Sequence, residues 1–325
     1  MRSSKIIKGK KVVVIGGGTG TFVVLSALKN YPVELTAIVS MADDGGSTGM
    51  LRDQYGVLPP GDARRALVAL SESSETLREL FNYRFQKGSL AGHSFGNIFL
   101  SALEQLKGNF GAAVEEASQV LNVKGRVLPV TLSNVRLFAE LADGKILKGE
   151  TNIDIPRTKI RAKIKKVWLS PGAKINPEAR EAIARADLIV IGPGDLYTSL
   201  IPNLLVRGAP EAIKKSKAKK VFVCNLMTKF GETHGFRAED FIEEIEKYLG
   251  KNVLDYAVFN NKKPHPKTLA RYKKEGAEFI EPPNVRNLVS DKVKPKYILA
   301  DLLDDGPFIR HNPRQKLAKV LTGLL

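Results

Sequence analysis

The sequence is poor in cysteine and in long apolar stretches, and each shortage excludes a class of protein. Cys224 is the single cysteine among 325 residues, which excludes an intrachain disulfide and a metal site built from several cysteines. No apolar run approaches the roughly 20 residues of a membrane span. The basic segment 1–11 leads directly into a strand-like run rather than into the apolar region of a signal peptide. We therefore expect a protein of the reducing cytoplasm, without a membrane span.

Histidine is scarce too, and its spacing predicts no metal centre. The chain has four histidines, and His234 and His265 lie too isolated in the sequence to predict a histidine metal site. His93 alone is weak evidence for catalysis. Cys224 has no histidine partner nearby, so buried packing is the favoured interpretation of this thiol.

Negative charge is in the minority. The chain has 51 Lys and Arg against 34 Asp and Glu, a formal net charge of +17. Such an excess suits nucleic acid, an acidic membrane surface or anionic small ligands. However, the basic runs 159–166, 214–220 and 262–274 alternate with apolar residues, and no nucleic-acid signature accompanies them. We therefore favour a solvated basic surface and consider nucleic acid the weaker partner prediction.

The hydrophobic pattern predicts an α/β fold with a mostly parallel sheet. Residues 11–15 and 34–40 have the pattern of strands, with a helix-like segment over 19–29 between them, which makes an almost explicit β–α–β unit. Further helices are expected within 61–105, over 110–121, at 177–186 beginning after Asn176, and at 241–249. Further strands are expected at 188–191, 221–224 and 256–259. These patterns indicate one α/β domain with helices on both faces of the sheet.

The middle of the chain differs from this pattern. Strand-like runs occur at 127–131, 135–141 and 145–148, and Asp143-Gly144 is a strong hairpin signal because both residues tolerate positive φ angles. We therefore predict a small antiparallel, β-rich insertion over about 126–168, packed on the main sheet.

Polar and glycine-rich loops follow the predicted parallel strands. Because ligands bind outside the carboxyl ends of such strands, these loops predict a long polar cleft along one rim. Each loop taken alone is equally compatible with ordinary turn chemistry. The loops are 16–21, 43–48, 192–198, 225–228 and 260–261.

The first glycine loop departs from two familiar fingerprints. Gly16, Gly17 and Gly18 begin a dinucleotide motif, but Thr21 stands where the third glycine belongs, and no Gly-Lys-Ser/Thr follows to make a P-loop. The backbone amides of 17–20 would still form a phosphate or diphosphate cradle at a helix N-terminus. The alternative is a purely structural tight turn.

Two adjacent carboxylates follow the second strand. Asp43 and Asp44 beside a phosphate loop would repel an anion unless a cation or a sugar hydroxyl intervened, so one of them is a candidate Mg²⁺ ligand and the other a candidate ribose contact. The alternative is a capped turn in which Ser47 is the helix N-cap. Asp62 and Asn97 are open in the same way, as helix caps or as groups that line the cleft.

An ordered set of motifs resembles the bacterial gluconeogenesis factor family, whose members are relatives of 2-phospho-L-lactate transferase. The set covers nearly the whole chain, and no single motif in it is decisive. It consists of Gly-Gly-Gly-Thr-Gly (16–20), Ala-Asp-Asp-Gly-Gly-Ser-Thr-Gly-Met-Leu-Arg (42–52), Leu-Pro-Pro-Gly-Asp (58–62), Ser-Phe-Gly-Asn (94–97), Ile-Gly-Pro-Gly (191–194), Leu-Tyr-Thr-Ser (196–199) and Asn-Leu-Met-Thr (225–228).

The resemblance implies a fold, a ligand and a biological role. It implies a Rossmann-like fold in a single CofD-like domain over 1–325, and a cytoplasmic bacterial protein that binds a UDP-sugar. The implied role lies in carbon metabolism, cell envelope synthesis and cell shape, with an envelope-synthesis protein as partner. The transferase relatives use Mg²⁺ to move a phospholactyl-type group onto a deazaflavin alcohol. We also expect a homo-oligomer.

Carried over by position, the resemblance assigns the site residues. Asp43, Asp44 and Asp62 would be the catalytic carboxylates, with Asp43 and Asp44 as the metal ligands. Asp195 stands where the family pattern has a small hydroxyl residue, which puts the contacts of that loop in doubt. The residues that would contact the nucleotide are Gly17, Gly18, Thr19, Gly20, Gly46, Ser47, Asn97, Gly192, Gly194, Thr198, Asn225, Met227, Thr228, Asn260, Tyr272 and Arg310. The alternatives are a helix anchor for Tyr272 and a surface charge for Arg310.

Two functions remain in competition. The first is a UDP-sugar-binding regulator, because the cleft offers amides and glycines but no general-base histidine, nucleophile or P-loop lysine. The second is a Mg²⁺-dependent transferase, because such chemistry needs positioning and charge neutralisation more than a covalent nucleophile. NAD(P) and GDP remain open as ligands, since both contain a diphosphate, but Thr21 argues against a nicotinamide oxidoreductase.

Overall fold

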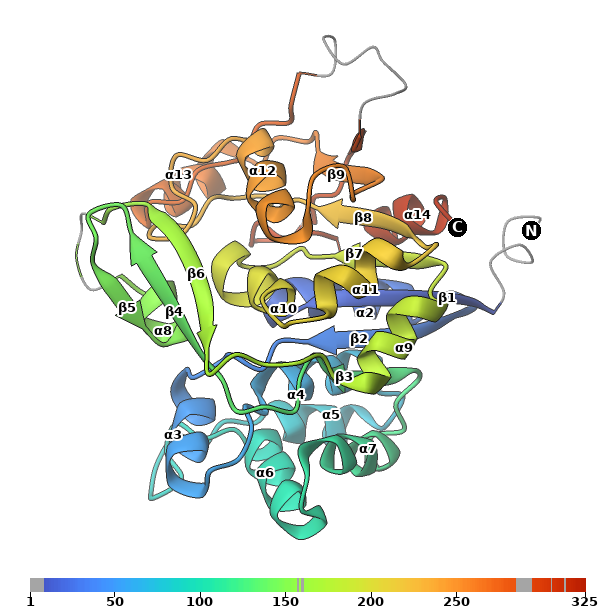
Figure 1. The fold of residues 1–325 in the computed structure, drawn as a ribbon, viewed down its shortest axis with the longest axis vertical. Coiled ribbons are helices and arrows are strands. Elements are labelled where there is room, and N and C mark those ends of the chain that lie inside the picture. Colours follow the sequence, from blue (N-terminus) through green and yellow to red (C-terminus); the bar gives the residue numbers. More distant parts are fainter. Residues whose placement is uncertain (1–8, 157, 159–160, 285–293, 305, 313) are drawn as a thin grey trace.

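The computed structural model describes residues 9–156, 158, 161–284, 294–304, 306–312 and 314–325. A seven-stranded sheet with the order β10-β9-β8-β7-β1-β2-β3 forms its centre, and every neighbouring pair of these strands runs parallel (Figure 1). The strands are β1 (Lys10–Gly16), β2 (Val33–Val39), β3 (Arg126–Pro129), β7 (Leu188–Ile191), β8 (Lys219–Val223), β9 (Tyr256–Asn260) and β10 (Lys296–Ala300). The predicted parallel α/β sheet is confirmed.

The strand order reverses at β1. The chain moves from β1 to β2 in one direction and from β7 through β8 to β9 in the other, so β1 lies between β2 and β7. At such a switch point the loops after two adjacent strands diverge and leave a crevice at their carboxyl ends. The glycine loop after β1 and the Pro193-containing loop after β7 both border this crevice.

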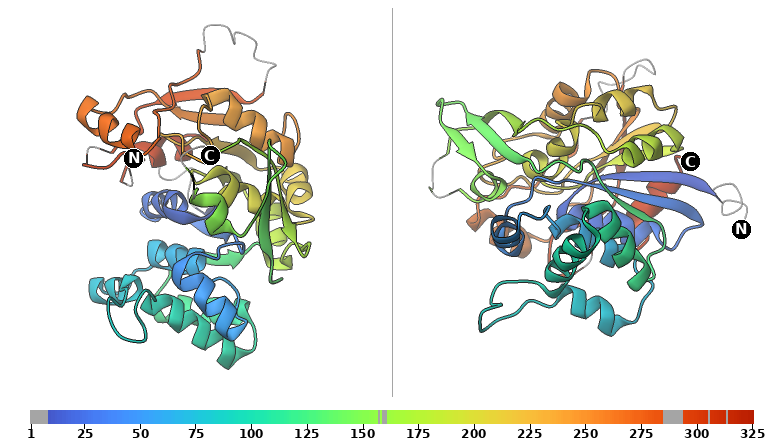
Figure 2. Two further views of the ribbon diagram at one scale, coloured as in Figure 1. Left: turned by 90° about the vertical axis from the view of Figure 1, so that its left-hand side faces the viewer. Right: turned by 60° about the horizontal axis from the view of Figure 1, so that its bottom comes forward.

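Helices cover both faces of the sheet, as predicted (Figures 1 and 2). In one group α2 packs against α4 and α14, and in the other α11 packs against α9 and α12. The helices are α2 (Gly18–Leu28), α3 (Gly46–Tyr55), α4 (Gly61–Leu70), α5 (Glu75–Asn82), α6 (Phe95–Lys107), α7 (Phe110–Val120), α8 (Glu150–Asp154), α9 (Pro177–Arg185), η1 (Leu196–Leu200, a π-helix), α10 (Ile201–Leu204), α11 (Ala209–Lys215), α12 (Ala238–Leu249), α13 (Pro266–Lys274) and α14 (Lys316–Thr322).

The β-rich insertion is confirmed, but its predicted beginning is wrong. Residues 126–129 form β3, which pairs in parallel with β2 and belongs to the main sheet. The apolar residues of β3 are buried as in the other core strands, and the run of turn residues at 131–134 separates it from the insertion. The separate antiparallel sheet has the order β5-β4-β6 and consists of β4 (Arg136–Leu141), β5 (Ile146–Lys148) and β6 (Ile164–Ser170).

Several local predictions are tested by backbone contacts. Gly144 has φ +85° in the β4–β5 turn, and Asn176 caps α9 by accepting a bond from the Glu178 amide, both as predicted. The alternative in which Ser47 caps a helix is wrong, because Gly45 is the N-cap of α3 and Ser47 lies inside that helix. Among the described helices, none has both the length and the apolar composition needed to cross a membrane.

Candidate functional site

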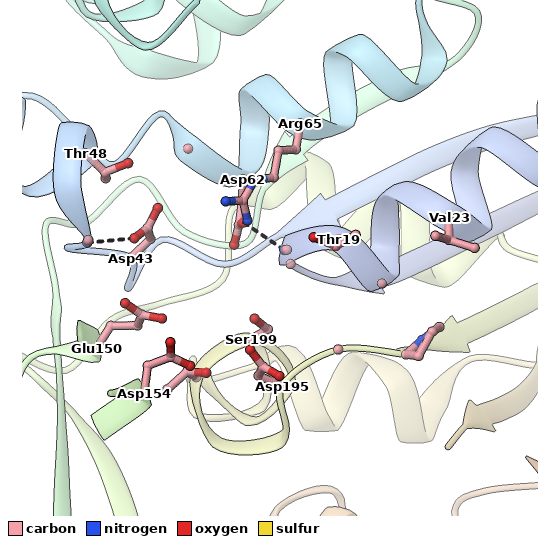
Figure 3. Close-up of a pocket in the computed structure, with 18 of the residues that line it drawn as sticks. Thr19, Val23, Asp43, Thr48, Asp62, Arg65, Glu150, Asp154, Asp195 and Ser199 are labelled. Atoms are coloured by element: carbon pink, nitrogen blue, oxygen red, sulfur yellow. Dashed lines mark hydrogen bonds and ion pairs between the residues drawn. The ribbon is translucent and has the colours of Figure 1, made fainter. Parts of the chain in front are cut away.

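A cavity of about 630 Å³ opens where the loops after β1, β2, β7 and β8 meet. Its wall is completed by the N-terminal end of α4, by α8 of the insertion and by the C-terminal segment 309–311. Figure 3 shows the labelled side chains of Asp43 and Asp62 on one side of this space and those of Glu150, Asp154 and Asp195 on the other. Four of the five predicted strand-end loops therefore meet at one polar cavity, whereas the predicted contribution of the loop 260–261 is wrong, because neither of its residues lines the cavity.

The glycine loop has the shape of an anion cradle, but a carboxylate already occupies part of it. The Gly18 amide begins α2 and donates to Asp62 Oδ1 at 2.8 Å. A Cβ at Gly17 would lie 2.2 Å from Asp62 Oδ2, so only glycine lets the carboxylate come this close. The amides of Thr19 and Gly20 lie in the first turn of α2, where the helix itself supplies no acceptor, so they are candidate donors to a ligand.

Gly20 brings the loops after β1 and β7 together. A Cβ at this position would lie 2.2 Å from the carbonyl oxygen of Pro193 and 3.0 Å from the amide nitrogen of Gly194. Both contacts are with backbone, which cannot rotate away. The close approach of the two loops therefore requires glycine at position 20.

We expect Gly20→Ala to destabilise the protein by about 1–3 kcal/mol, because relief of the clash must move one of the two loops. Gly172→Ala is the matched control, since a Cβ there would meet nothing within 4 Å. Urea unfolding of both variants measures the difference. Equal stabilities would show that the loops separate without cost.

Five carboxylates from four segments line the cavity: Asp43, Asp62, Glu150, Asp154 and Asp195. Asp43 accepts a bond from the Gly45 amide at 2.9 Å and lies against the start of α4, where a Cβ on Gly61 would be 2.3 Å from Asp43 Oδ2. Glu150 and Asp154 are four residues apart on α8, so they lie on one face of that helix. The cavity therefore concentrates negative charge in a protein whose net charge is positive.

This crowding changes the protonation of the carboxyl groups. Burial, together with the charge of Asp43, raises the pKa of Asp62 to about 6. Burial and the charges of Asp43, Asp154, Asp44 and Asp62 raise the pKa of Glu150 to about 9. Burial also raises the pKa of Asp43. A cation bound among these carboxyl groups would lower their pKa values, because it would favour the ionised form of each of them.

Basic side chains border the same cavity. Arg65 Nη1 lies 3.7 Å from Asp62 Oδ1 and its side chain is 44% exposed, so it is available to an incoming anion. Arg64 is buried, and its guanidinium donates to Asn97 Oδ1 at 3.0 Å and to Asn82 Oδ1 at 2.5 Å. Arg84 also lines the cavity. Arg64 is thus an anchor for the wall, whereas Arg65 and Arg84 are candidate phosphate contacts.

The far wall consists of residues after β8 and near the C-terminus. Asn225 accepts a bond from the Gly194 amide at 3.3 Å and so joins the loops after β7 and β8. The Tyr272 hydroxyl accepts a bond from the Ile309 amide at 3.2 Å, and the Arg271 guanidinium lies 5.3 Å from the Tyr272 ring centre. Arg310 Nε pairs with Asp304 Oδ2 at 2.9 Å. Tyr272, Arg310 and Met227 all line the cavity.

Most of the residues predicted from the sequence come together here. Those that line the cavity are Gly17, Gly18, Thr19, Gly20, Asp43, Gly46, Ser47, Asp62, Asn97, Gly194, Thr198, Asn225, Met227, Tyr272 and Arg310. Lining does not by itself assign a ligand contact, so these roles remain predictions. Ser47, for example, accepts a bond from the Ser94 amide at 3.2 Å and lies 3.3 Å from His93 Nδ1.

Four predicted residues lie outside the lining: Asp44, Gly192, Thr228 and Asn260. Asp44 accepts a bond from the Thr151 amide at 2.9 Å and lies 3.5 Å from Arg136 Nη1, so it ties the loop after β2 to the insertion. Thr228 accepts a bond from the Glu278 amide, and Asn260 accepts one from the Leu302 amide. These contacts give each of the three side chains a structural partner within the protein.

Sequence reasoning missed Glu150 and Asp154, because they lie in the segment expected to be β-rich. The signal was present, since Glu150-Thr-Asn-Ile-Asp154 places two carboxylates at the i, i+4 spacing of one helical turn. The departure at Asp195 also has an explanation. Its carboxylate pairs with Lys229 Nζ at 2.8 Å, so its charge is balanced locally.

Comparison with protein families places this architecture among known proteins. The model of 2-phospho-L-lactate transferase CofD matches residues 12–301. A putative gluconeogenesis factor from Thermotoga maritima is 46% identical over 315 residues, which cover 96% of this chain and 98% of that protein. A putative gluconeogenesis factor from Nostoc sp. is 48% identical over 323 residues, which cover 98% of this chain and 69% of that protein.

A solved structure extends the comparison to three dimensions. A crystal structure of a member of the UPF0052 family from Bacillus halodurans superposes with a TM-score of 0.90 at 42% identity and covers 98% of this chain and 99% of that one. The gluconeogenesis factor of Bacillus subtilis is 43% identical over 274 residues, 83% of this chain and 85% of that protein.

Proposed function

This chain belongs to the gluconeogenesis factor family and carries a domain of the 2-phospho-L-lactate transferase CofD type, and from that premise we propose that its cavity binds a nucleoside diphosphate-linked sugar together with a divalent cation. A UDP-sugar is the first candidate, with GDP and NAD(P) as competitors of the same diphosphate chemistry. The observation that carries the proposal is the meeting of a glycine loop with five carboxylates in one cavity of about 630 Å³.

The carboxylates fit Mg²⁺ by their chemistry. Carboxylate oxygens are the donors that this hard cation prefers, and Mg²⁺ is commonly held by one or two carboxylates together with substrate phosphates. Asp43 and Glu150 have raised pKa values because burial and neighbouring carboxylates disfavour their ionised forms. They are therefore the residues that would hold the cation, which would supply the positive charge that allows a diphosphate to approach them.

Each part of the wall then has a role toward the ligand. The first-turn amides of Thr19 and Gly20 donate to phosphate oxygens, helped by the positive end of α2. Arg65, which is already partly exposed beside Asp62, neutralises phosphate charge at the opening. The wall formed by Met227, Tyr272 and Ile309 offers apolar and aromatic surface for the base.

The ligand is bound without covalent chemistry from this chain. Burial of the Cys224 thiol raises its pKa, so it is a poor nucleophile. The imidazole of His311, which lines the cavity, has its pKa lowered to about 4 by burial. We therefore favour a ligand-binding regulator that acts in carbon metabolism, envelope synthesis and cell shape by presenting its liganded state to a protein partner.

The carboxylate cluster also supports a second candidate, a transferase of the CofD type. In that reaction an acceptor hydroxyl attacks a phosphorus of the diphosphate, and the bond to the nucleoside monophosphate breaks. Asp62, with a pKa of about 6, is the group placed to take the acceptor proton. Release of nucleoside monophosphate in the presence of a deazaflavin alcohol separates the candidates, since a regulator releases none.

We expect Tyr272→Ala to weaken UDP-sugar binding by about tenfold, because stacking of one base on an aromatic ring contributes about 1–3 kcal/mol. Tyr272→Phe should retain most of the affinity, since it keeps the ring and loses only the bond to the Ile309 amide. Tyr55→Ala, at an exposed position outside the cavity lining, is the control. Calorimetric titration measures the affinities of all three variants. Unchanged affinity in Tyr272→Ala would show that the base does not stack on Tyr272.

A further inference from the structure

Beside the cavity, three carboxylates from distant segments converge on one point. Asp154 ends α8, Asp195 precedes η1 and Glu232 follows β8, and one oxygen of each lies within 4.8 Å of the other two. Glu232 is 1% exposed, whereas Asp154 and Asp195 both reach the cavity. Three oxygens at this spacing are compatible with a cation between them.

The point on which they converge is taken by Lys229. Its ammonium contacts Asp154 Oδ1, lies 2.8 Å from Asp195 Oδ2 and lies 3.6 Å from Glu232 Oε1. Burial alone would lower the pKa of Lys229, but the charges of Asp195, Glu232 and Asp154 outweigh it and raise that pKa. The ammonium is therefore charged at any physiological pH, and it contacts all three carboxylates that would otherwise be available to a metal.

The same cluster determines where α8 lies. Gly231, two residues after Lys229, has φ +90°, and a Cβ there would lie 2.2 Å from Pro156 Cγ, so the segment after α8 packs directly on this turn. On the other side of the cluster, Glu232 accepts bonds from the Tyr197 amide and the Thr198 hydroxyl of η1. Lys229 thus joins the insertion, the loop after β7 and the loop after β8.

This arrangement affects the cavity through Glu150. Glu150 is one helical turn from Asp154, so a contact that fixes Asp154 also fixes the position of Glu150 opposite Asp43. It also divides the five carboxylates of the cavity into two sets. Asp154 and Asp195 share the positive charge of Lys229, whereas Asp43, Asp62 and Glu150 have no lysine among the contacts described above.

We propose that Lys229 is a built-in cation that replaces a divalent metal between Asp154, Asp195 and Glu232 and positions Glu150 for the ligand cavity. It is a positioning residue, since it acts through Asp154 and is absent from the cavity lining. Its effect on the nucleotide rests on the proposed function, whereas the occupation of the carboxylate cluster does not.

The test measures Mn²⁺ binding to the full chain without nucleotide. Lys229→Met removes the charge and keeps the length of the side chain. We expect it to bind one more Mn²⁺ per chain than the wild type does, as measured from the loss of the free Mn²⁺ signal in electron paramagnetic resonance. Lys229→Arg keeps the cation and should bind as the wild type does. Lys107→Met is the matched control, because it breaks a lysine–glutamate pair between α6 and α7, away from the cavity.

A second readout separates this role from general structural support. In EDTA, Lys229→Met should melt at a lower temperature than the wild type, and Mn²⁺ should restore the loss, whereas no such restoration is expected in Lys107→Met. If Lys229→Met does not fold, Lys229→Gln is measured in its place. An unchanged Mn²⁺ stoichiometry, or failure of both variants to fold even with Mn²⁺, would overturn the proposal.

The effect of Lys229→Met on nucleotide affinity is measured in a separate experiment. If the wild type binds a UDP-sugar, Lys229→Met should weaken that binding about 10- to 100-fold in Mg²⁺, the range typical for residues that orient metal ligands. If the wild-type protein binds no nucleotide, this result contradicts the proposed function but not the proposal for Lys229. An extra Mn²⁺ in Lys229→Met would still support the built-in cation.

Discussion

Replacement of Asp43 by asparagine is expected to weaken UDP-sugar binding in Mg²⁺ by about 100-fold, or about 2.7 kcal/mol. Asp43 lies in the loop after β2, faces Glu150 across the cavity and is held in place by the Gly45 amide. Asparagine keeps that bond and the shape of the side chain but removes the charge that favours a cation. Calorimetric titration with the same UDP-sugar, in Mg²⁺ and in EDTA, measures the change.

Two further variants make this result specific. Asp53→Asn removes an exposed carboxylate from α3 and should leave the affinity unchanged. Asp44→Asn should lower thermal stability equally in Mg²⁺ and EDTA, because asparagine keeps the acceptor for the Thr151 amide but loses the charge that pairs with Arg136. Wild-type affinity in Asp43→Asn would show that the cation, if one binds, is held elsewhere.

Replacement of Glu150 by glutamine is expected to stabilise the ligand-free protein at alkaline pH. The folded-state pKa of Glu150 is about 9, against 4.5 for the unfolded chain. The folded protein therefore holds a proton that the unfolded chain has released, so stability is full below pH 4.5 and is lost as the pH rises towards 9. Glutamine resembles the protonated carboxyl at every pH and escapes this loss.

The expected gain is about 5 kcal/mol at pH 8.5, or an increase of about 10 °C or more in melting temperature. At pH 4 the two proteins should melt within about 1 °C of each other, since the carboxyl is then largely protonated in both the folded and the unfolded chain. Glu115→Gln, at an exposed position on α7, is the control. A gain that is independent of pH would show that Glu150 is not held protonated in the folded state.

The same variant should lose the response to Mg²⁺. A cation that binds only the folded state raises the melting temperature by mass action. We expect Mg²⁺ to stabilise the wild type at pH 8.5 and to have little effect on Glu150→Gln. Stability and ligand binding are thus opposed at this residue, a trade-off that is common where a buried charge serves function.

The sequence predicted the sheet and the loops because their signals are local. β1 and β7 are continuous apolar runs buried on both faces, and the residues that follow them are glycine and polar loop residues. Once two such strands are adjacent and parallel, their loops must meet at one edge of the sheet. This reasoning predicted, without any contact information, that Gly17–Gly20, Gly194 and Asn225 line the same cavity.

The carboxylates across the cavity were beyond this reasoning, because their position depends on tertiary contacts. Glu150 and Asp154 reach the cavity only because α8 docks on η1, through a lysine seventy-five residues later in the chain. Asp44 illustrates the reverse case. Its neighbour Asp43 faces the cavity, but the Thr151 amide and Arg136 draw Asp44 away, and no pattern in residues 43–48 distinguishes the two carboxylates.

The central claim, a diphosphate bound together with a divalent cation, is tested most directly by one calorimetric titration. The wild-type protein is titrated with a UDP-sugar in Mg²⁺ and again in EDTA, with GDP and NAD(P) as competitors. The account predicts saturable binding in Mg²⁺ that is lost or strongly weakened in EDTA, because five carboxylates line the cavity that the diphosphate must enter. Equal affinity in both buffers, or no binding of any of the nucleotides in Mg²⁺, would contradict it.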